Sequence, residues 1–163
     1  LEPGLTHGFD LFPELIDNFT DSSKVMLLFS FFHPLIPSFS LELAKKNVQA
    51  QLIFSRDSFD RLSGDFHDTG EKIMAKGNAS IFIYEGGPLE IPALIAVSDN
   101  ALLLGLFNKK GRFEGQYLLN FEPLSLAWGK ELFEYYRDRS ENVLSMDSPR
   151  PFPDANGGLS NLR

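Results

Sequence analysis

A chain of 163 residues that is 43% hydrophobic and 23% charged has the composition of a folded globular domain, which excludes an intrinsically disordered protein. Its 15 basic and 22 acidic residues give a net charge of −7, which argues against a duplex DNA-binding module, because such modules use Lys and Arg at the phosphates. The sequence contains no cysteine, so disulfides, thiolate zinc sites and a cysteine nucleophile are excluded.

The start of the sequence and its apolar runs bear on where the protein resides. The chain begins with Leu1 instead of Met and lacks the basic segment that opens a signal peptide. Its apolar runs are all shorter than the roughly 18 residues that a membrane-spanning helix needs. We therefore expect a cytoplasmic fragment of a longer protein, without membrane contact.

Helices and strands alternate in the first half of the chain. Helices are predicted over 12–19 and 38–47, and strands over 24–32, 49–54 and 79–84. Ser38 is a capping residue type, and Asn47 is suited to end a helix in the left-handed conformation. Between the second and third strands the pattern is helical but is interrupted by Gly64 and Gly70, so one kinked helix and two helices are equally compatible with it.

The second half begins with a hairpin over residues 93–107, in which Asp99 and Asn100 form the turn. A strand is predicted over 117–120, and a long helix over 122–144. One face of that helix carries Leu124, Trp128, Leu132 and Tyr135 at spacings of three and four residues. We expect Trp128 in the core.

This order of elements predicts an α/β fold, a mixed sheet sandwiched by helices, in which right-handed crossovers make the early strands parallel. We expect a single domain over residues 1–144. The remaining residues, 145–163, are rich in Pro, Gly, Ser and Asn and are predicted to be a tail that is either flexible or docked on the surface.

Three stretches, at 41–62, 95–113 and 126–140, resemble the sensor domain of archaeal helix-turn-helix regulators of the methanogenesis-regulator type. The last is the most specific, because Trp-Gly followed by Leu-Phe-Glu-Tyr-Tyr-Arg is an unusual string for a helix. The resemblance implies an effector-binding or dimerising domain of a transcription factor. In such regulators DNA is bound by a separate N-terminal winged helix, which this sequence does not contain.

The hairpin resembles the strand–turn–strand of phospholipase D-like enzymes, which carries His-x-Lys, four further residues and Asp, and then Gly-Ser-x-Asn. When Asp99 takes the Asp place, the nucleophilic His position falls on Pro92 and the phosphate-binding Lys position on Leu94. Gly105 and Asn108 keep the Gly and Asn spacing. The resemblance implies a phospholipase D-like half-domain without its catalytic residues, since neither proline nor leucine can replace them.

Several polar residues have two interpretations. Ser55 is either a nucleophile or, more simply, a helix cap or part of a turn; without a Gly-x-Ser-x-Gly elbow we favour the cap or turn. Asp57 and Asp60 are either an acid–base pair or part of a solvated helix face. None of the three histidines lies at metal-binding spacing from a second ligand-type residue, so we predict no metal and no cofactor.

We therefore expect a non-catalytic sensor that forms a homodimer and binds a small-molecule effector at the ends of the strands, where α/β sheets place their crevices. The candidate ligand contacts are Phe31, His33, Phe54, Arg56, Tyr84 and Glu85. His33 has the alternative of an ordinary loop histidine. The candidate dimer contacts are Phe133 and Tyr136, because aromatic side chains are enriched in interface cores. The alternative function is a dimerisation scaffold that binds no ligand.

Overall fold

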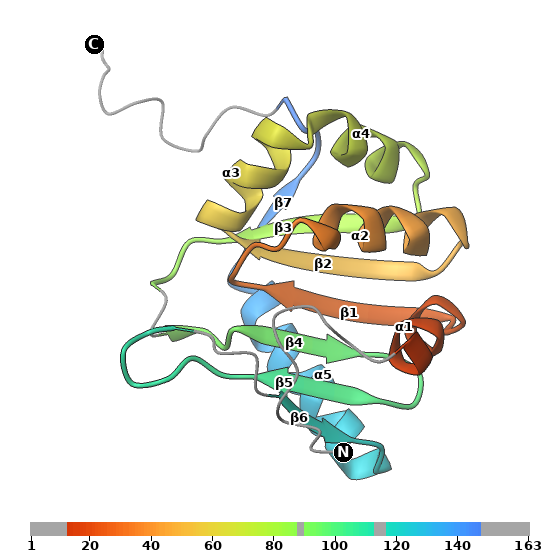
Figure 1. Ribbon diagram of the computed structural model, residues 1–163, viewed down its shortest axis with the longest axis vertical. Helices are drawn as coiled ribbons and strands as arrows, with labels where there is room; N and C mark the ends of the chain where they lie inside the picture. Colours follow the sequence, from red (N-terminus) through yellow and green to blue (C-terminus); the bar gives the residue numbers. More distant parts are fainter. Residues whose placement is uncertain (1–12, 88–89, 113–116, 148–163) are drawn as a thin grey trace.

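A computed structural model describes residues 13–87, 90–112 and 117–147, which form a seven-stranded sheet with helices on both faces (Figure 1). The strands are β1 (Lys24–Phe29), β2 (Gln49–Ser55), β3 (Ala79–Tyr84), β4 (Leu94–Val97), β5 (Leu102–Gly105), β6 (Tyr117–Asn120) and β7 (Glu141–Val143). The helices are α1 (Pro13–Thr20), α2 (Leu35–Lys45), α3 (Arg56–Asp65), α4 (His67–Ala75) and α5 (Pro123–Arg137).

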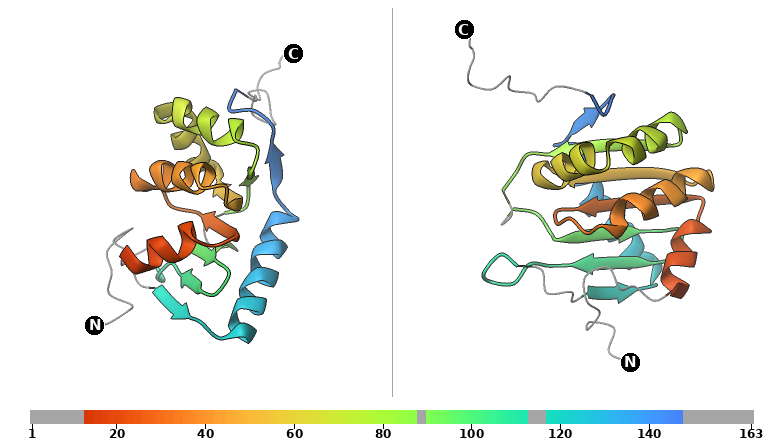
Figure 2. Two further views of the ribbon diagram at one scale, coloured as in Figure 1. Left: turned by 90° about the vertical axis from the view of Figure 1, so that its right-hand side faces the viewer. Right: turned by 45° about the horizontal axis from the view of Figure 1, so that its top comes forward.

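The strand order across the sheet is β6-β5-β4-β1-β2-β3-β7. Strands β1, β2 and β3 are parallel, and the other neighbouring pairs are antiparallel. The expected mixed sheet with parallel early strands is confirmed. Of the helices that the structure describes, α1 to α4 cover one face and α5 crosses the other (Figure 2).

The central strands are apolar throughout because both faces of the sheet are covered. In β1, Leu27 and Phe29 point into the core beneath α1 to α4, whereas Met26 and Leu28 point into the smaller core beneath α5. The continuous apolar run in the sequence is the consequence of this two-sided burial.

The strand predicted over 24–32 ends at Phe29, and the chain bends at the next two residues, Ser30 and Phe31. Helix α2 begins at Leu35, three residues before the predicted Ser38 cap. The first N–H group of this helix, that of Leu35, donates a hydrogen bond to His33 Nδ1 at 3.1 Å. Asn47 has a φ of 61°, which confirms the left-handed residue after this helix.

The segment from Arg56 to Ala75 forms two helices, and the break lies at Phe66 instead of at either glycine. Phe66 leaves the helical conformation, with φ −127° and ψ 35°. Its ring packs on Phe32 with centroids 5.6 Å apart, so the break brings an aromatic side chain to the core. Ser55 caps α3 as predicted, accepting a hydrogen bond from Ser58 N at 3.2 Å.

The helix predicted over 122–144 ends at Arg137, and residues 141–143 form strand β7 instead. Ser140 Oγ donates to the carbonyl of Tyr136 at 2.7 Å, which closes the helix end. The next residues pair with β3, and this pairing between distant segments overrides the local helical pattern.

The face of α5 that packs on the sheet also differs from the predicted one. Its buried residues are Gly129, Phe133 and Tyr136. Trp128, expected in the core, is 50% exposed, and Leu124 is 85% exposed. The helix thus has two apolar stripes. The sheet covers the stripe that was not predicted to face it, whereas the stripe with Leu124 and Trp128 stays exposed.

The start of the predicted tail is docked. Met146 is buried against Gly70 of α4, and Asp147 lies 2.7 Å from His67 of the same helix. Residues 148–163 lie outside the described part of the chain. Among the described residues, no helix has the length and apolarity required to cross a membrane.

Candidate functional site

The carboxyl ends of the three parallel strands meet at one edge of the sheet. The register places Phe29 beside Phe54, and Ser55 beside Tyr84. Because β4 is antiparallel to β1, its first residue Leu94 arrives at the same edge. The edge therefore gathers the residues that follow β1, β2 and β3 together with the start of the hairpin.

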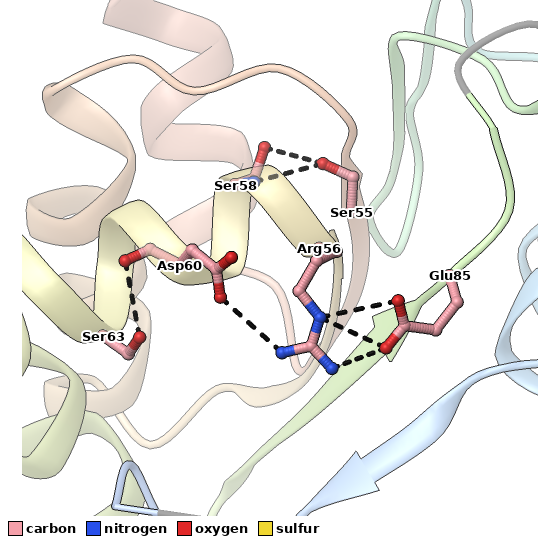
Figure 3. A network of polar contacts seen from close by, with 6 residues as sticks. All are labelled: Ser55, Arg56, Ser58, Asp60, Ser63 and Glu85. Carbon is pink, nitrogen blue, oxygen red and sulfur yellow. Dashed lines mark hydrogen bonds and ion pairs between the residues drawn. The ribbon is translucent and has the colours of Figure 1, made fainter. Parts of the chain in front are cut away.

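An ion pair joins two of the predicted ligand contacts at this edge (Figure 3). Arg56 is the first residue of α3 and directly follows β2, and Glu85 directly follows β3. Arg56 Nη2 donates to Glu85 Oε2 at 2.5 Å, and Nε donates to the same oxygen at 3.2 Å. Arg56 Nη1 also lies 3.6 Å from Asp60 Oδ1, one turn along α3. The guanidinium is held between two carboxylates.

The surroundings of Arg56 keep it charged. Its side chain is only 18% exposed, whereas that of Glu85 is 44% exposed. Burial lowers the pKa of Arg56, but hydrogen bonds and charges from Glu85 and Asp60 outweigh burial, so the net effect raises this pKa. The site therefore presents a fixed cation whose main partner is accessible to solvent. Such a cation can recognise the carboxylate or phosphate of a ligand.

The other predicted ligand contacts lie in different surroundings from this pair. Phe54 is fully buried beneath the helical layer, where its ring lies 5.7 Å from that of Phe29. Tyr84 points to the opposite face and packs edge-on against Tyr136, with centroids 5.3 Å apart. Phe31 is half-buried against the helical layer.

A small apolar cavity lies within the helical layer of the core. Its lining is Phe19, Leu27, Phe29, Phe39, Leu94, Ala96 and Leu103. The cavity volume is about 10 Å³, which is at the lower limit for one water molecule. An effector of ordinary size does not fit there.

The two ends of β4 have separate structural roles. At the carboxyl edge, Leu94 is buried and the carbonyl of Pro92 accepts a hydrogen bond from Ser30 Oγ at 2.5 Å. At the far end, Asp99 binds the backbone at the start of β1. Beyond the hairpin, Asn108 closes a turn, since its Oδ1 accepts from Lys110 N and Arg112 N, each at 2.9 Å.

The model of one family, the middle domain of the methanogenesis regulatory protein FilR1, matches residues 8–139. The chain belongs to this family. It is a regulatory domain of an archaeal type of transcription regulator, as the resemblance in sequence implied. No curated protein sequence matches the chain.

Two solved structures share the fold of this FilR1-type middle domain. TrmBL2, an archaeal chromatin protein, is similar with a TM-score of 0.60 and 14% identity, over 80% of this chain and 49% of that chain. The chain thus spans about half of the length of TrmBL2. The phospholipase D family member Nuc from Salmonella typhimurium is similar with a TM-score of 0.59 and 12% identity, over 80% of this chain and 88% of that chain. The expected phospholipase D-like fold is confirmed.

The residues predicted as dimer contacts lie inside this domain. Phe133 is fully buried between α5 and the sheet. Tyr136 is 9% exposed, and its hydroxyl donates to the carbonyl of Glu90 at 3.0 Å. Both side chains therefore serve the contact between α5 and the sheet of their own chain, and a dimer surface on α5 must use other residues.

An apolar groove of about 330 Å³ lies between the edge of the sheet and the start of α5. Its lining is Leu102, Leu104, Leu118, Asn120, Leu124, Ser125 and Trp128. Sequence reasoning found the apolar stripe that carries Leu124 and Trp128 but assigned it to the core. The edge position of β6, which leaves this stripe uncovered, was not visible in the sequence.

A further cluster joins α4 to the segment after β7. The possible metal-ligand atoms of His67, Glu71 and Asp147 all lie within 4.8 Å of one another. The four-residue spacing of His67 and Glu71 on α4 was present in the sequence and was missed, whereas the approach of Asp147 depends on β7. All three side chains are partly or fully exposed, and the short contact between His67 and Asp147 accounts for their arrangement without an ion.

Proposed function

We propose that this domain is a non-catalytic sensor of a cytoplasmic transcription regulator, and that it binds a small acidic effector through Arg56. The observation that carries the proposal is the ion pair between Arg56 and Glu85 at the carboxyl edge of the parallel strands. A carboxylate or phosphate group of the effector would take the place of Glu85 on the guanidinium. Membership of a family of regulatory domains supports this role.

The exchange of partners would couple binding to the position of α3. Arg56 is the first residue of α3, and Glu85 follows β3, so their contact ties the helix to the end of a strand. An effector changes the geometry of a dimer only by its different affinity for two states. The two states would be those with and without the Arg56–Glu85 contact, and the effector would bind more tightly to the state in which Glu85 has left Arg56. DNA would be bound by a separate domain of the regulator.

The proposal of a non-catalytic domain rests on the hairpin. Pro92 has no nucleophilic side chain, and Leu94 has no charge and is buried. Turnover of a chromogenic phosphodiester by the purified chain would contradict this part of the proposal.

Thermal unfolding in the presence of small acids tests the effector proposal. Acetate, succinate and inorganic phosphate are the probes, and the variants are Arg56→Gln and Arg61→Gln. Arg61 is a matched control, because it is also an α3 arginine paired with an acid four residues away, Asp65. We expect a probe to raise the melting temperature of the wild type and of Arg61→Gln but not of Arg56→Gln. Equal shifts in both variants, or no shift in the wild type, would contradict the proposal.

The alternative function is a dimerisation scaffold that binds no small molecule. The groove between β6 and α5 favours this alternative, because it is an uncovered apolar surface in the described part of the chain. Native mass spectrometry of the protein separates the two. A non-covalent adduct of a few hundred daltons that is lost on denaturation supports the sensor, and a dimer without adduct supports the scaffold.

A further inference from the structure

The β6–α5 patch, which comprises Leu102, Leu104, Leu118, Leu124 and Trp128, forms an apolar groove with exposed walls at the edge of the sheet. Leu102 and Leu104 are buried at its floor, whereas Leu118 is 63% exposed and Leu124 is 85% exposed. Phe121, which is 58% exposed, lies between β6 and α5 in the sequence. Monomeric proteins rarely leave contiguous apolar surface of this kind uncovered.

We propose that this patch is the surface through which two copies of the chain associate. The proposal rests on the dimer in the proposed function and assigns it to particular residues. Three properties of the patch favour a second copy: its shape, its position at a strand edge and its lack of charge.

The patch combines a hollow with an exposed apolar side chain, which is what a contact between two identical surfaces requires. The same surface carries an apolar hollow, floored by Leu102 and Leu104, and a projecting apolar side chain, Leu124. In a two-fold dimer each copy presents one patch to the same patch of the other. The projecting leucine of each copy can therefore enter the hollow of the other. A small ligand fits less well, because ligand pockets bury most of their ligand and the walls of this groove are exposed.

The edge strand has the geometry of a two-fold contact. Strand β6 pairs only with β5 among the described strands, so its other edge is open in that part of the chain. Two copies of β6 placed antiparallel would continue the sheet around a two-fold axis. In such a pairing, side chains on the α5 side of one strand must lie opposite side chains on the same side of the other. Leu118 of one copy therefore lies opposite Leu118 or Asn120 of the second copy, because a slip by one residue would exchange the two faces of the strand. The apolar grooves of the two copies then join.

The patch offers no charged side chain to a strongly charged partner. The side chains that line the groove are all uncharged, whereas the chain as a whole has a net charge of −7. Two copies would repel each other at long range and attract each other through the apolar contact. Added salt screens this repulsion, so it should strengthen the association of two copies. It would weaken the docking of a basic domain at this surface.

The exposed area of the patch is enough for the centre of an interface. Trp128 is half exposed, so it supplies on the order of 100 Å². The two exposed leucines add to this apolar centre. A standard interface takes about 800 Å² from each partner, with an apolar centre and a polar rim, so this patch would supply the centre and only part of the area.

Sedimentation of the full chain from about 1 to about 100 μM tests the proposal without any effector. The variant is Leu124→Glu, and the matched control is Leu144→Glu, since Leu144 is 82% exposed and lies outside the patch. A glutamate at position 124 lies in the first turn of α5, where a negative charge favours the helix, so folding should be unaffected. We expect Leu124→Glu to raise the dimer dissociation constant at least about tenfold and Leu144→Glu to leave it unchanged.

Fluorescence of Trp128, the single tryptophan, provides a second readout. Its emission should shift to shorter wavelength as the concentration rises, and salt from about 50 to about 500 mM should strengthen the dimer. A monomer at all concentrations, or equal effects of the two variants, would overturn the proposal. A short-wavelength emission that does not change with concentration would instead place another segment of the chain on the patch. Because no acid is added, these outcomes are independent of the thermal shifts that test Arg56.

Discussion

The carboxylate of Asp99 accepts a hydrogen bond from the backbone N–H of Ser23 at 2.7 Å, although 76 positions separate the two residues. The same carboxylate accepts from Lys24 N at 3.2 Å and lies 3.0 Å from Ser23 Oγ. Asp99 stands in the hairpin turn between β4 and β5, and Ser23 immediately precedes β1. The aspartate therefore fastens the hairpin to the start of the central strand.

Replacement of Asp99 by Asn tests this fastening. Asparagine keeps the size of the side chain but removes the negative charge, so its hydrogen bonds to the backbone N–H groups are weaker. We expect the free energy of unfolding to fall by about 1 kcal/mol, since the site is exposed to water. Urea unfolding measures the change. Asn100→Asp is a useful control, because it alters the other turn residue and keeps Asp99; a larger loss in this control would contradict the assigned role.

The same carboxylate should make stability depend on pH. The backbone hydrogen bond from Ser23 is the largest cause that lowers the pKa of Asp99. A lowered pKa in the folded state means that the stabilisation is present above the pKa of the unfolded chain, about 3.9, and is lost as the pH falls through the folded-state pKa. The difference in unfolding free energy between wild type and Asp99→Asn should therefore be constant from pH 7 to about pH 5 and shrink below about pH 4. A difference that persists unchanged to pH 3 would show that the charge is not responsible.

Gly129 allows α5 to approach the sheet closely. A Cβ at this position would lie 2.7 Å from Leu102 Cδ1 and 3.3 Å from Val97 Cγ2. Gly129→Ala should therefore destabilise the protein by about 1 kcal/mol, because overpacking outweighs the better helix propensity of alanine. Gly64→Ala in α3 is the matched control, since no heavy atom lies within 4 Å of its added Cβ. The control should gain up to about 1 kcal/mol. Thermal or urea unfolding of both variants measures the contrast, and a stabilised Gly129→Ala would show that the contact relaxes freely.

The sequence was sufficient to predict the elements that local pattern determines. Strand β3 has the predicted bounds because ASIFIY is a short apolar run between polar breaks. The proximity of Arg56 and Glu85 was also predictable, since residues that follow neighbouring parallel strands lie at the same carboxyl edge of the sheet. In these cases the information lies within a few residues or in the order of the strands.

The features that depend on distant partners were not predictable in this way. Residues 141–143 continue a helical pattern, and only β3 makes them a strand. The two apolar stripes of α5 are similar in composition, so the sequence alone could not show that Phe133 packs inward while Trp128 stays exposed. The contact between Asp99 and Ser23 likewise requires the position of β1 beside the hairpin.

The contact between His67 and Asp147 leads to a last prediction, about how the segment after β7 is held on α4. The two side chains approach to 2.7 Å, and the hydrogen bond to Asp147 is the largest cause that raises the pKa of His67. A raised pKa in the folded state means that the contact stabilises the docked segment fully below the unfolded pKa of about 6.5 and weakens as the pH rises through the folded-state pKa. Titration of the His67 ring by NMR should give a higher midpoint in the wild type than in Asp147→Asn. Asp68→Asn is the control, because Asp68 is 4.0 Å from the ring and its charge contributes least to the raised pKa, so its loss should move the midpoint less. If Asp147→Asn leaves the midpoint unchanged, the segment after β7 is held by the packing of Met146 on Gly70 and not by this pair.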